Sequence, residues 1–190
     1  MKNNNISIMS ASKKRKTKET SIEVFLEVMG QGTVQADTGI ELLNEILSAL
    51  ARGGGLDIRV RARGDLETGD HHTVEDTAIT LGSALSQEIV KGIGSSSVPS
   101  GQSLARAAVR FGEVGYQGSF HLEHQTIAGM SLDNFGHFLR ALAYNGGFNL
   151  FISAEGGNDR SQIEAMSMAL GRAIKKAAMD KIQKMEKNEN

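Results

Sequence analysis

The 190-residue chain contains no cysteine and no tryptophan, and its one proline is Pro99. Without cysteine there are no disulfides and no thiolate metal ligands, which fits a cytoplasmic location in a reducing compartment. The formal net charge of −1 creates no general attraction to a nucleic acid or an anionic membrane, so we expect neither as a partner. No apolar run approaches the ~20 residues that a membrane-spanning helix needs.

The first 18 residues are polar and then basic, and they lack the apolar segment of a secretory signal peptide. The basic residues are Lys13, Lys14, Arg15, Lys16 and Lys18. Runs of like charge usually remain solvated, so we expect residues 1–18 to form a flexible basic arm. The alternative is an arm that packs across a neighbouring subunit.

The rest of the chain alternates between strand and helix patterns in two rounds of the same order. The first half, residues 19–93, predicts strands over 21–29, 33–37 and 56–63 and helices over 39–52 and 70–91. The second half, residues 102–187, predicts strands over 104–111, 117–123 and 148–152 and helices over 132–144 and 159–185. A Gly/Ser-rich stretch, 92–101, reads as a loop between the halves. This order indicates an internal duplication within one compact domain.

Matching residues support the duplication. Residues 49–55 read Ala-Leu-Ala-Arg-Gly-Gly-Gly, and 92 positions later residues 141–147 read Ala-Leu-Ala-Tyr-Asn-Gly-Gly. Beyond a three-residue shortening the offset becomes 89, so that Glu75 and Gly82 correspond to Glu164 and Gly171. Each half has one amphipathic sheet and two amphipathic helices. The predicted fold is therefore α+β, with the helices sandwiched between two sheets.

The start of the 70–91 helix carries the densest chemistry, in the sequence Asp70-His71-His72-Thr73-Val74-Glu75. Asp70 is a natural N-cap, whose carboxylate we expect to accept a hydrogen bond from a first-turn amide. His71, His72 and Glu75 lie within one helical turn and offer a partial shell for Mn, Fe or Zn. The alternative is a solvated helix start with two incidental histidines.

The second half tests this motif internally, because a duplicated metal site should carry the same ligands twice. Residues 160–164 read Arg-Ser-Gln-Ile-Glu, so Glu164 remains and both imidazoles are absent. Arginine retains its proton at ordinary pH and cannot act as a ligand. Half of the symmetrical shell is therefore missing.

Residues 64–76 end in Asp-His-His-Thr-Val-Glu-Asp and resemble the HHTVED signature of imidazoleglycerol-phosphate dehydratases. The likeness extends from about Arg15 to Ala177 and includes Thr38-Gly39-Ile40 and residues 141–145. It implies a duplicated fold of the ribosomal S5 domain 2-like type and a homo-oligomeric shell, usually of 24 subunits. It also implies dehydration of imidazoleglycerol phosphate to imidazoleacetol phosphate in histidine biosynthesis, with two Mn ions per active site at subunit interfaces.

Carried over position by position, the resemblance implies His71, His72, Glu75 and Glu164 as metal ligands. Glu45 replaces a ligand histidine of the family and retains a carboxylate that can coordinate. The residues implied in catalysis are Glu19, Glu75 and Glu164, with Glu19 or Glu45 as the proton-transfer group. His137 stands 92 positions after Glu45 and is a candidate replacement ligand, or else an ordinary helix histidine.

Other positions depart from the family pattern. Phe151 replaces a histidine, Arg160-Ser161 replaces the second His-His pair, and Ser95 replaces an arginine that grips phosphate. Residues 99–102 and 167–168 also differ from the family. The expected function is thus a dehydratase with a depleted metal site. The alternatives are a non-catalytic relative acting as a structural or regulatory shell subunit, and a different metal-dependent lyase or isomerase on the same scaffold.

Overall fold

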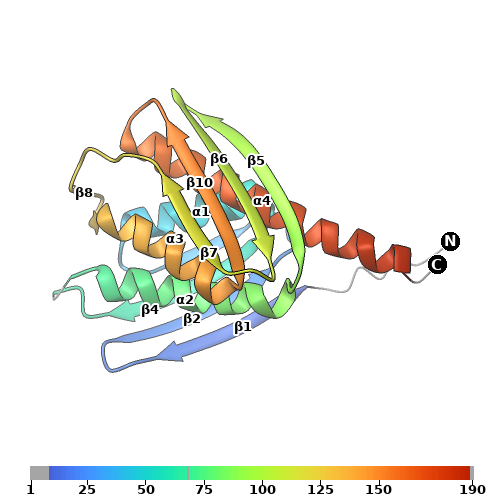
Figure 1. Cartoon of the computed structure of the whole chain (residues 1–190). Coiled ribbons are helices and arrows are strands. Elements are labelled where there is room, and N and C mark those ends of the chain that lie inside the picture. The colour runs from blue at the N-terminus through green and yellow to red at the C-terminus, as the bar shows by residue number, and fades with distance from the viewer. Residues whose placement is uncertain (1–8, 68, 189–190) are drawn as a thin grey trace.

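The computed structural model describes residues 9–67 and 69–188 (Figure 1). Over these residues the chain forms four helices and ten strands. The first half runs β1 (Ser10–Lys16), β2 (Thr20–Glu27), β3 (Val34–Asp37), α1 (Glu41–Gly54), β4 (Asp57–Gly64) and α2 (His71–Glu88). The second half runs β5 (Gly92–Ser100), β6 (Ser103–Phe111), β7 (Gly115–Ser119), α3 (Asp133–Gly146), β10 (Phe148–Glu155) and α4 (Asp159–Asn188), with a short hairpin of β8 (Thr126–Ile127) and β9 (Met130–Ser131) before α3. The expected duplication is present in the order of the elements.

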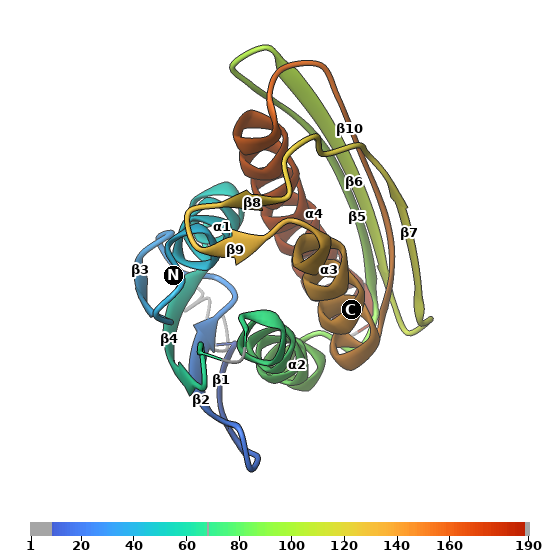
Figure 2. The same cartoon turned by 90° about the vertical axis from the view of Figure 1, so that its left-hand side faces the viewer.

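The two larger sheets have the same topology. Their strand orders are β1-β2-β4-β3 and β5-β6-β10-β7. In both sheets the first three strands of that order are antiparallel neighbours, and the last pair, β4 with β3 or β10 with β7, is parallel. The helices fill the space between the sheets (Figure 2), which confirms the predicted α+β sandwich.

Glycines bring the paired helices into backbone contact. A Cβ on Gly171 of α4 would lie 2.1 Å from the carbonyl oxygen of Leu50 and 2.8 Å from the amide nitrogen of Gly54, both on α1. A Cβ on Gly82 of α2 would lie 2.8 Å from the carbonyl oxygen of Leu142 and 2.8 Å from the amide nitrogen of Gly146, on α3. Leu142 and Gly146 are the duplicates of Leu50 and Gly54. The same helix–helix contact, which we call the glycine joint, therefore occurs in both halves.

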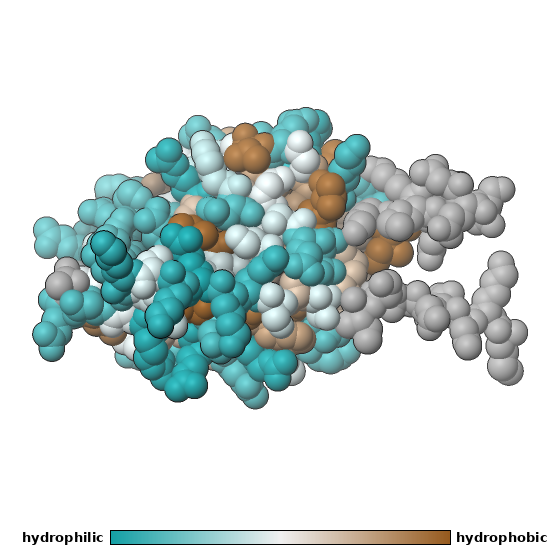
Figure 3. Space-filling view, turned by 90° about the horizontal axis from the view of Figure 1, so that it is seen from below, coloured by the Kyte–Doolittle hydropathy of each residue, from teal (hydrophilic) through white to brown (hydrophobic). Residues whose placement is uncertain are grey.

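The core lies between the sheets, and their outer faces are polar. Alternate residues of β2, such as Ile22, Val24 and Leu26, are buried against the helices. Figure 3 shows the molecule from below, on the side of the first sheet, where hydrophilic side chains cover most of the surface. Among the described residues, no helix is long and apolar enough to cross a membrane.

The expected flexible arm is wrong for residues 10–16, which form β1 and pair with β2 from Ser10↔Glu27 to Lys16↔Ser21. Residues 1–8 of that arm lie outside the described part of the chain. The run of like charge was misleading because two of its basic side chains have acidic partners on neighbouring elements. Lys14 Nζ lies 2.8 Å from Glu23 Oε1, and Arg15 Nε lies 2.7 Å from Asp76 Oδ1 on α2.

The expected loop over 92–101 is also wrong, because residues 92–100 form β5 at the edge of the second sheet. Its small residues reflect close packing on α4. A Cβ on Gly94 would lie 2.0 Å from the carbonyl oxygen of Ala173 and 2.7 Å from the amide nitrogen of Ala177. Glycine and other small residues suggest a flexible linker in the sequence. Here the glycine is needed because the strand lies directly against the backbone of α4.

We predict that Gly171→Ala destabilises the protein by about 3 kcal/mol, because its Cβ would collide with the α1 backbone. For a chain of this size that corresponds to a melting temperature about 6–12 °C lower, measurable by circular dichroism. Gly136→Ala, in the interior of α3, is the matched control. A Cβ there meets only the Tyr116 hydroxyl, at 3.9 Å, so this change should stabilise the helix by about 1 kcal/mol. Equal changes in melting temperature for the two substitutions would contradict the backbone contact between α1 and α4 at Gly171.

Candidate functional site

The His-His motif lies at the start of α2, at the end of the molecule that faces the viewer in Figure 2. Asp70 occupies the N-cap position, as predicted, but the expected hydrogen bond is wrong, because its side chain caps no first-turn amide. Its carboxylate instead accepts the backbone N–H of Ser131 at 2.9 Å. Asp70 thus ties the β8–β9 hairpin to the helix start.

The His71 ring is oriented by α3. Its Nδ1 lies 2.8 Å from Oδ1 of Asn134. Its Nε2 lies 3.6 Å from Glu75 Oε2. Asn134 is buried, and the ring of His137, one turn further along α3, lies 5.0 Å from the His71 ring.

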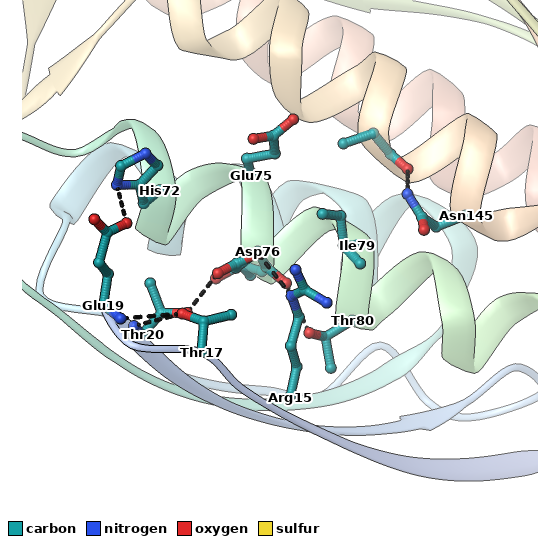
Figure 4. A network of polar contacts seen from close by, with 12 residues as sticks. Arg15, Thr17, Glu19, Thr20, His72, Glu75, Asp76, Ile79, Thr80 and Asn145 are labelled. Atoms are coloured by element: carbon teal, nitrogen blue, oxygen red, sulfur yellow. Dashed lines mark hydrogen bonds and ion pairs between the residues drawn. The ribbon is translucent and has the colours of Figure 1, made fainter.

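The His72 ring is oriented by the first hairpin. Its Nδ1 lies 2.7 Å from Oε2 of Glu19, which precedes β2 (Figure 4). A carboxylate that holds one ring nitrogen fixes the tautomer and leaves the other nitrogen to bind or exchange a proton. We call His71, His72, Glu75, Asn134 and His137 the α2 cluster.

Glu19 is positioned by a buried carboxylate that the sequence reasoning missed. Asp76 lies on the inner side of α2, where it accepts hydrogen bonds from the Thr20 hydroxyl and from Arg15 Nε (Figure 4). The Thr17 hydroxyl in turn accepts the backbone N–H groups of Glu19 and Thr20. The β1–β2 turn is therefore fixed on the helix beside His72. The available signal was an acidic residue among apolar positions of α2, opposite a basic strand.

The other two predicted ligands have different neighbours. Nε and Nη2 of Arg160 on α4 donate to both carboxylate oxygens of Glu45 on α1, with Nε 2.9 Å from Oε2. Glu164 accepts a hydrogen bond from Arg52 Nη2 at 3.2 Å and another from the Ser100 hydroxyl at 2.9 Å. We call Glu45, Arg52, Arg160 and Glu164 the α4 cluster. The structure does not bring Glu45 or Glu164 to His71 within this chain.

The two clusters fit a metal ion differently. His71, His72 and Glu75 offer two imidazoles and a carboxylate, which are the ligand types that Mn, Fe and Zn accept. Across residues 9–67 and 69–188, no three His, Cys, Asp or Glu side chains converge as a metal site. These three side chains therefore do not form a complete metal site by themselves. The α4 cluster does not fit, because its carboxylates are paired with guanidinium groups.

Ser95, which replaces a phosphate-gripping arginine of the family, lies on the outer face of the second sheet. Ser95, Phe151, Arg106 and Lys176 border a hollow of about 830 Å³. Lys176 Nζ donates to the Ser95 carbonyl at 2.8 Å, and Arg106 Nη2 lies 3.3 Å from the carboxylate of Glu155. Phe151, which replaces a family histidine, is about half exposed on this face.

The α4 helix start mirrors the Asp70 contact. Asp159, the duplicate of Asp70, is buried and accepts the N–H groups of Glu123 and His124 at 2.9 and 2.8 Å. The ring nitrogen Nδ1 of His124 also contacts this carboxylate, at 2.7 Å from Asp159 Oδ2. Burial alone would raise the pKa of Asp159, but the N–H donors and the His124 ring lower that pKa below its ordinary value of 3.8. His121 and His124 are both exposed.

Comparison with known proteins gives one consistent family. A family model described as imidazoleglycerol-phosphate dehydratase matches residues 38–174. The chain is 36% identical over 178 residues to the imidazoleglycerol-phosphate dehydratase of Methanothermobacter thermautotrophicus, covering 90% of this chain and 92% of that protein. It is 39% identical over 178 residues to that of Desulforudis audaxviator, covering 90% and 91%.

Solved structures agree. The imidazoleglycerol-phosphate dehydratase of Staphylococcus aureus superposes with a TM-score of 0.74 at 26% identity, covering 88% of this chain and 97% of that chain. The enzyme of Pyrococcus furiosus, in complex with (S)-C348, gives a TM-score of 0.74 at 27% identity, covering 87% and 92%.

We predict that Asp159→Asn lowers the free energy of unfolding at pH 7 by about 2 kcal/mol, because charged hydrogen bonds to the carboxylate are lost. The pKa of Asp159 is depressed in the folded state, so its contribution is present above pH 4 and is lost as the pH falls through the folded pKa. The difference in unfolding free energy between wild type and variant, from urea curves, should therefore shrink as the pH falls below 4. Asp133→Asn, at the exposed start of α3, is the control and should cost about 0.5 kcal/mol. A pH-independent difference would contradict the role of the charge.

Proposed function

Because the chain belongs to the imidazoleglycerol-phosphate dehydratase family, we propose that it removes water from imidazoleglycerol phosphate to give imidazoleacetol phosphate in histidine biosynthesis. The observation that carries this proposal is the α2 cluster with Glu19. Two adjacent histidines at one helix start each face a carboxylate, in the pairs His72–Glu19 and His71–Glu75.

The names of substrate and product define the bonds that change. The carbon attached to the imidazole loses its hydroxyl, and the neighbouring carbon loses a proton. The resulting enol then takes up a proton at the carbon beside the ring and becomes a ketone. The leaving hydroxide needs a proton, and the carbon-bound hydrogen needs a base. The reaction thus requires groups that can both accept and return protons within reach of one site.

We assign this proton transfer to the Glu19 carboxylate, whose Oε2 lies 2.7 Å from Nδ1 of His72. Because Glu19 holds Nδ1, Nε2 of His72 is the ring nitrogen left to hold a metal ion. Glu45, the other candidate for the role, is in a two-point ion pair with Arg160, and Glu164 pairs with Arg52. His71, held by Asn134, presents its Nε2 beside Glu75 and orients the second imidazole of the site.

We also propose manganese as the ion of the α2 cluster, with His71, His72 and Glu75 holding it. When bound, it would supply the positive charge that binds and activates the imidazole ring of the substrate. Because the α2 cluster is an incomplete shell, further donors would come from a neighbouring copy of the chain in a homo-oligomeric, 24-subunit shell. A cysteine-free chain fits a cytoplasmic site of action.

We predict that the Mn-loaded protein converts imidazoleglycerol phosphate and that His72→Ala lowers kcat/KM about 10–100-fold, because it removes a metal ligand and the ring that Glu19 contacts. Glu19→Gln should lower kcat about 100-fold, since an amide cannot take up and return the proton. The control is His121→Ala, an exposed histidine outside the α2 cluster, which should leave the rate unchanged. The assay measures release of imidazoleacetol phosphate.

Growth of a histidine auxotroph lacking its own dehydratase provides the cellular test. Wild type should restore growth, and His72→Ala should not. A folded, assembled wild-type protein that neither restores growth nor turns over the substrate would contradict the proposed activity. That result would favour the non-catalytic shell subunit.

A further inference from the structure

The duplication places residues of the α2 and α4 clusters in equivalent positions. The glycine joints match contact for contact, with Gly171 on Leu50 and Gly54 in one and Gly82 on Leu142 and Gly146 in the other. Arg160 lies 89 positions after His71, and His137 lies 92 positions after Glu45. By these offsets Arg160 corresponds to His71, and Glu45 corresponds to His137.

The contacts follow this correspondence. His71 on α2 meets His137 on α3 with the rings 5.0 Å apart, and Arg160 on α4 meets Glu45 on α1 at 2.9 Å. The pair of residues that meets across the helices at this point is therefore equivalent in the two halves. Two imidazoles meet in one half, and a cation meets a carboxylate in the other.

The two clusters differ in what they offer to a divalent cation. Neutral imidazoles present lone pairs, whereas a guanidinium holds its protons and its positive charge at every ordinary pH. Arg160 also lies 4.0 Å from Glu41. Glu164, the duplicate of Glu75, faces the second arginine, Arg52, whose own duplicate in the other half is the uncharged Tyr144.

The α4 cluster borders a hollow of about 300 Å³ between α1 and α4, lined by Glu45, Arg52, Arg160 and Glu164 together with apolar residues of both helices. Both carboxylates of this hollow accept hydrogen bonds from arginine. A planar guanidinium with two donors directed at one carboxylate is among the stronger ion-pair geometries at a protein surface.

We propose that the α4 cluster is a metal-independent clamp, in which the Arg160 guanidinium takes the place that a divalent cation would fill between α1 and α4. The clamp joins the start of α4 to the start of α1 through Arg160 and Glu45, and it joins Glu164 of α4 to the last turn of α1 through Arg52. It excludes a metal ion by charge. Cation binding is then confined to the α2 cluster. This inference goes beyond the proposed function, since it assigns a structural role that does not require turnover.

A thermal double-mutant cycle on the full chain tests the clamp. Glu45→Gln and Arg160→Gln should each lower the melting temperature by about 3 °C, and the double variant should fall no further than either alone. The Lys14–Glu23 pair on β1 and β2, 2.8 Å apart and well exposed, is the control, with Lys14→Gln and Glu23→Gln each shifting the melt by less than about 1 °C. Additive losses at Glu45 and Arg160, or losses no larger than in the control, would overturn the clamp.

Metal content tests the exclusion. Wild-type protein purified from Mn-supplemented cells should contain the same Mn per chain as Glu45→Gln, measured by mass spectrometry of the metal. The double substitution Arg160→His with Ser161→His restores a His-His-x-x-Glu sequence before Glu164 and should raise Mn by about one equivalent per chain. Loss of Mn in Glu45→Gln, or no gain in the restored variant when it is folded, would overturn the exclusion. None of these readouts uses dehydratase activity, so they separate this inference from the proposed function.

Discussion

Backbone contact between paired helices is the constraint on which the rest of the structure depends. At Gly171 and at Gly82 a single added carbon would meet a carbonyl oxygen of the facing helix, so the paired helices are held in close backbone contact. This contact fixes which residues face each other near the helix starts. Position 160 must meet position 45, and position 71 must meet position 137. The chemistry of each cluster is thus determined by which side chains occupy four positions of a shared frame.

The same frame carries different chemistry in its two halves. In the α2 cluster, Asn134 and Glu19 each hold one ring nitrogen, which orients the two imidazoles. In the α4 cluster, a fixed cation already neutralises the carboxylates. Arg160 keeps its positive charge at every ordinary pH, so a divalent ion beside it would be repelled. A duplicated fold can in this way keep its packing while only one half keeps a metal-type cluster.

Much of this arrangement can be predicted from the sequence, and the exceptions have physical causes. Alternation in β2 and β4 and the glycine-terminated helices predicted the sandwich correctly, because burial on one face leaves a periodic pattern. The strands β1 and β5 were missed because their side chains are charged or absent: Lys14 and Arg15 pair with distant acids, and Gly94 lies on the α4 backbone. The His-His motif is local and was found. The Arg160–Glu45 pair joins residues 115 positions apart, and no local pattern marks it.

The two halves share a fold, but we infer that only the α2 cluster binds a metal ion. Anomalous diffraction from crystals grown with Mn²⁺ can test this difference, because it locates each ion relative to both clusters in one experiment. We expect a Mn peak beside His71 and His72 and none beside Arg160 and Glu45. A peak between α1 and α4 at Arg160, or the absence of any peak at the α2 cluster, would contradict it.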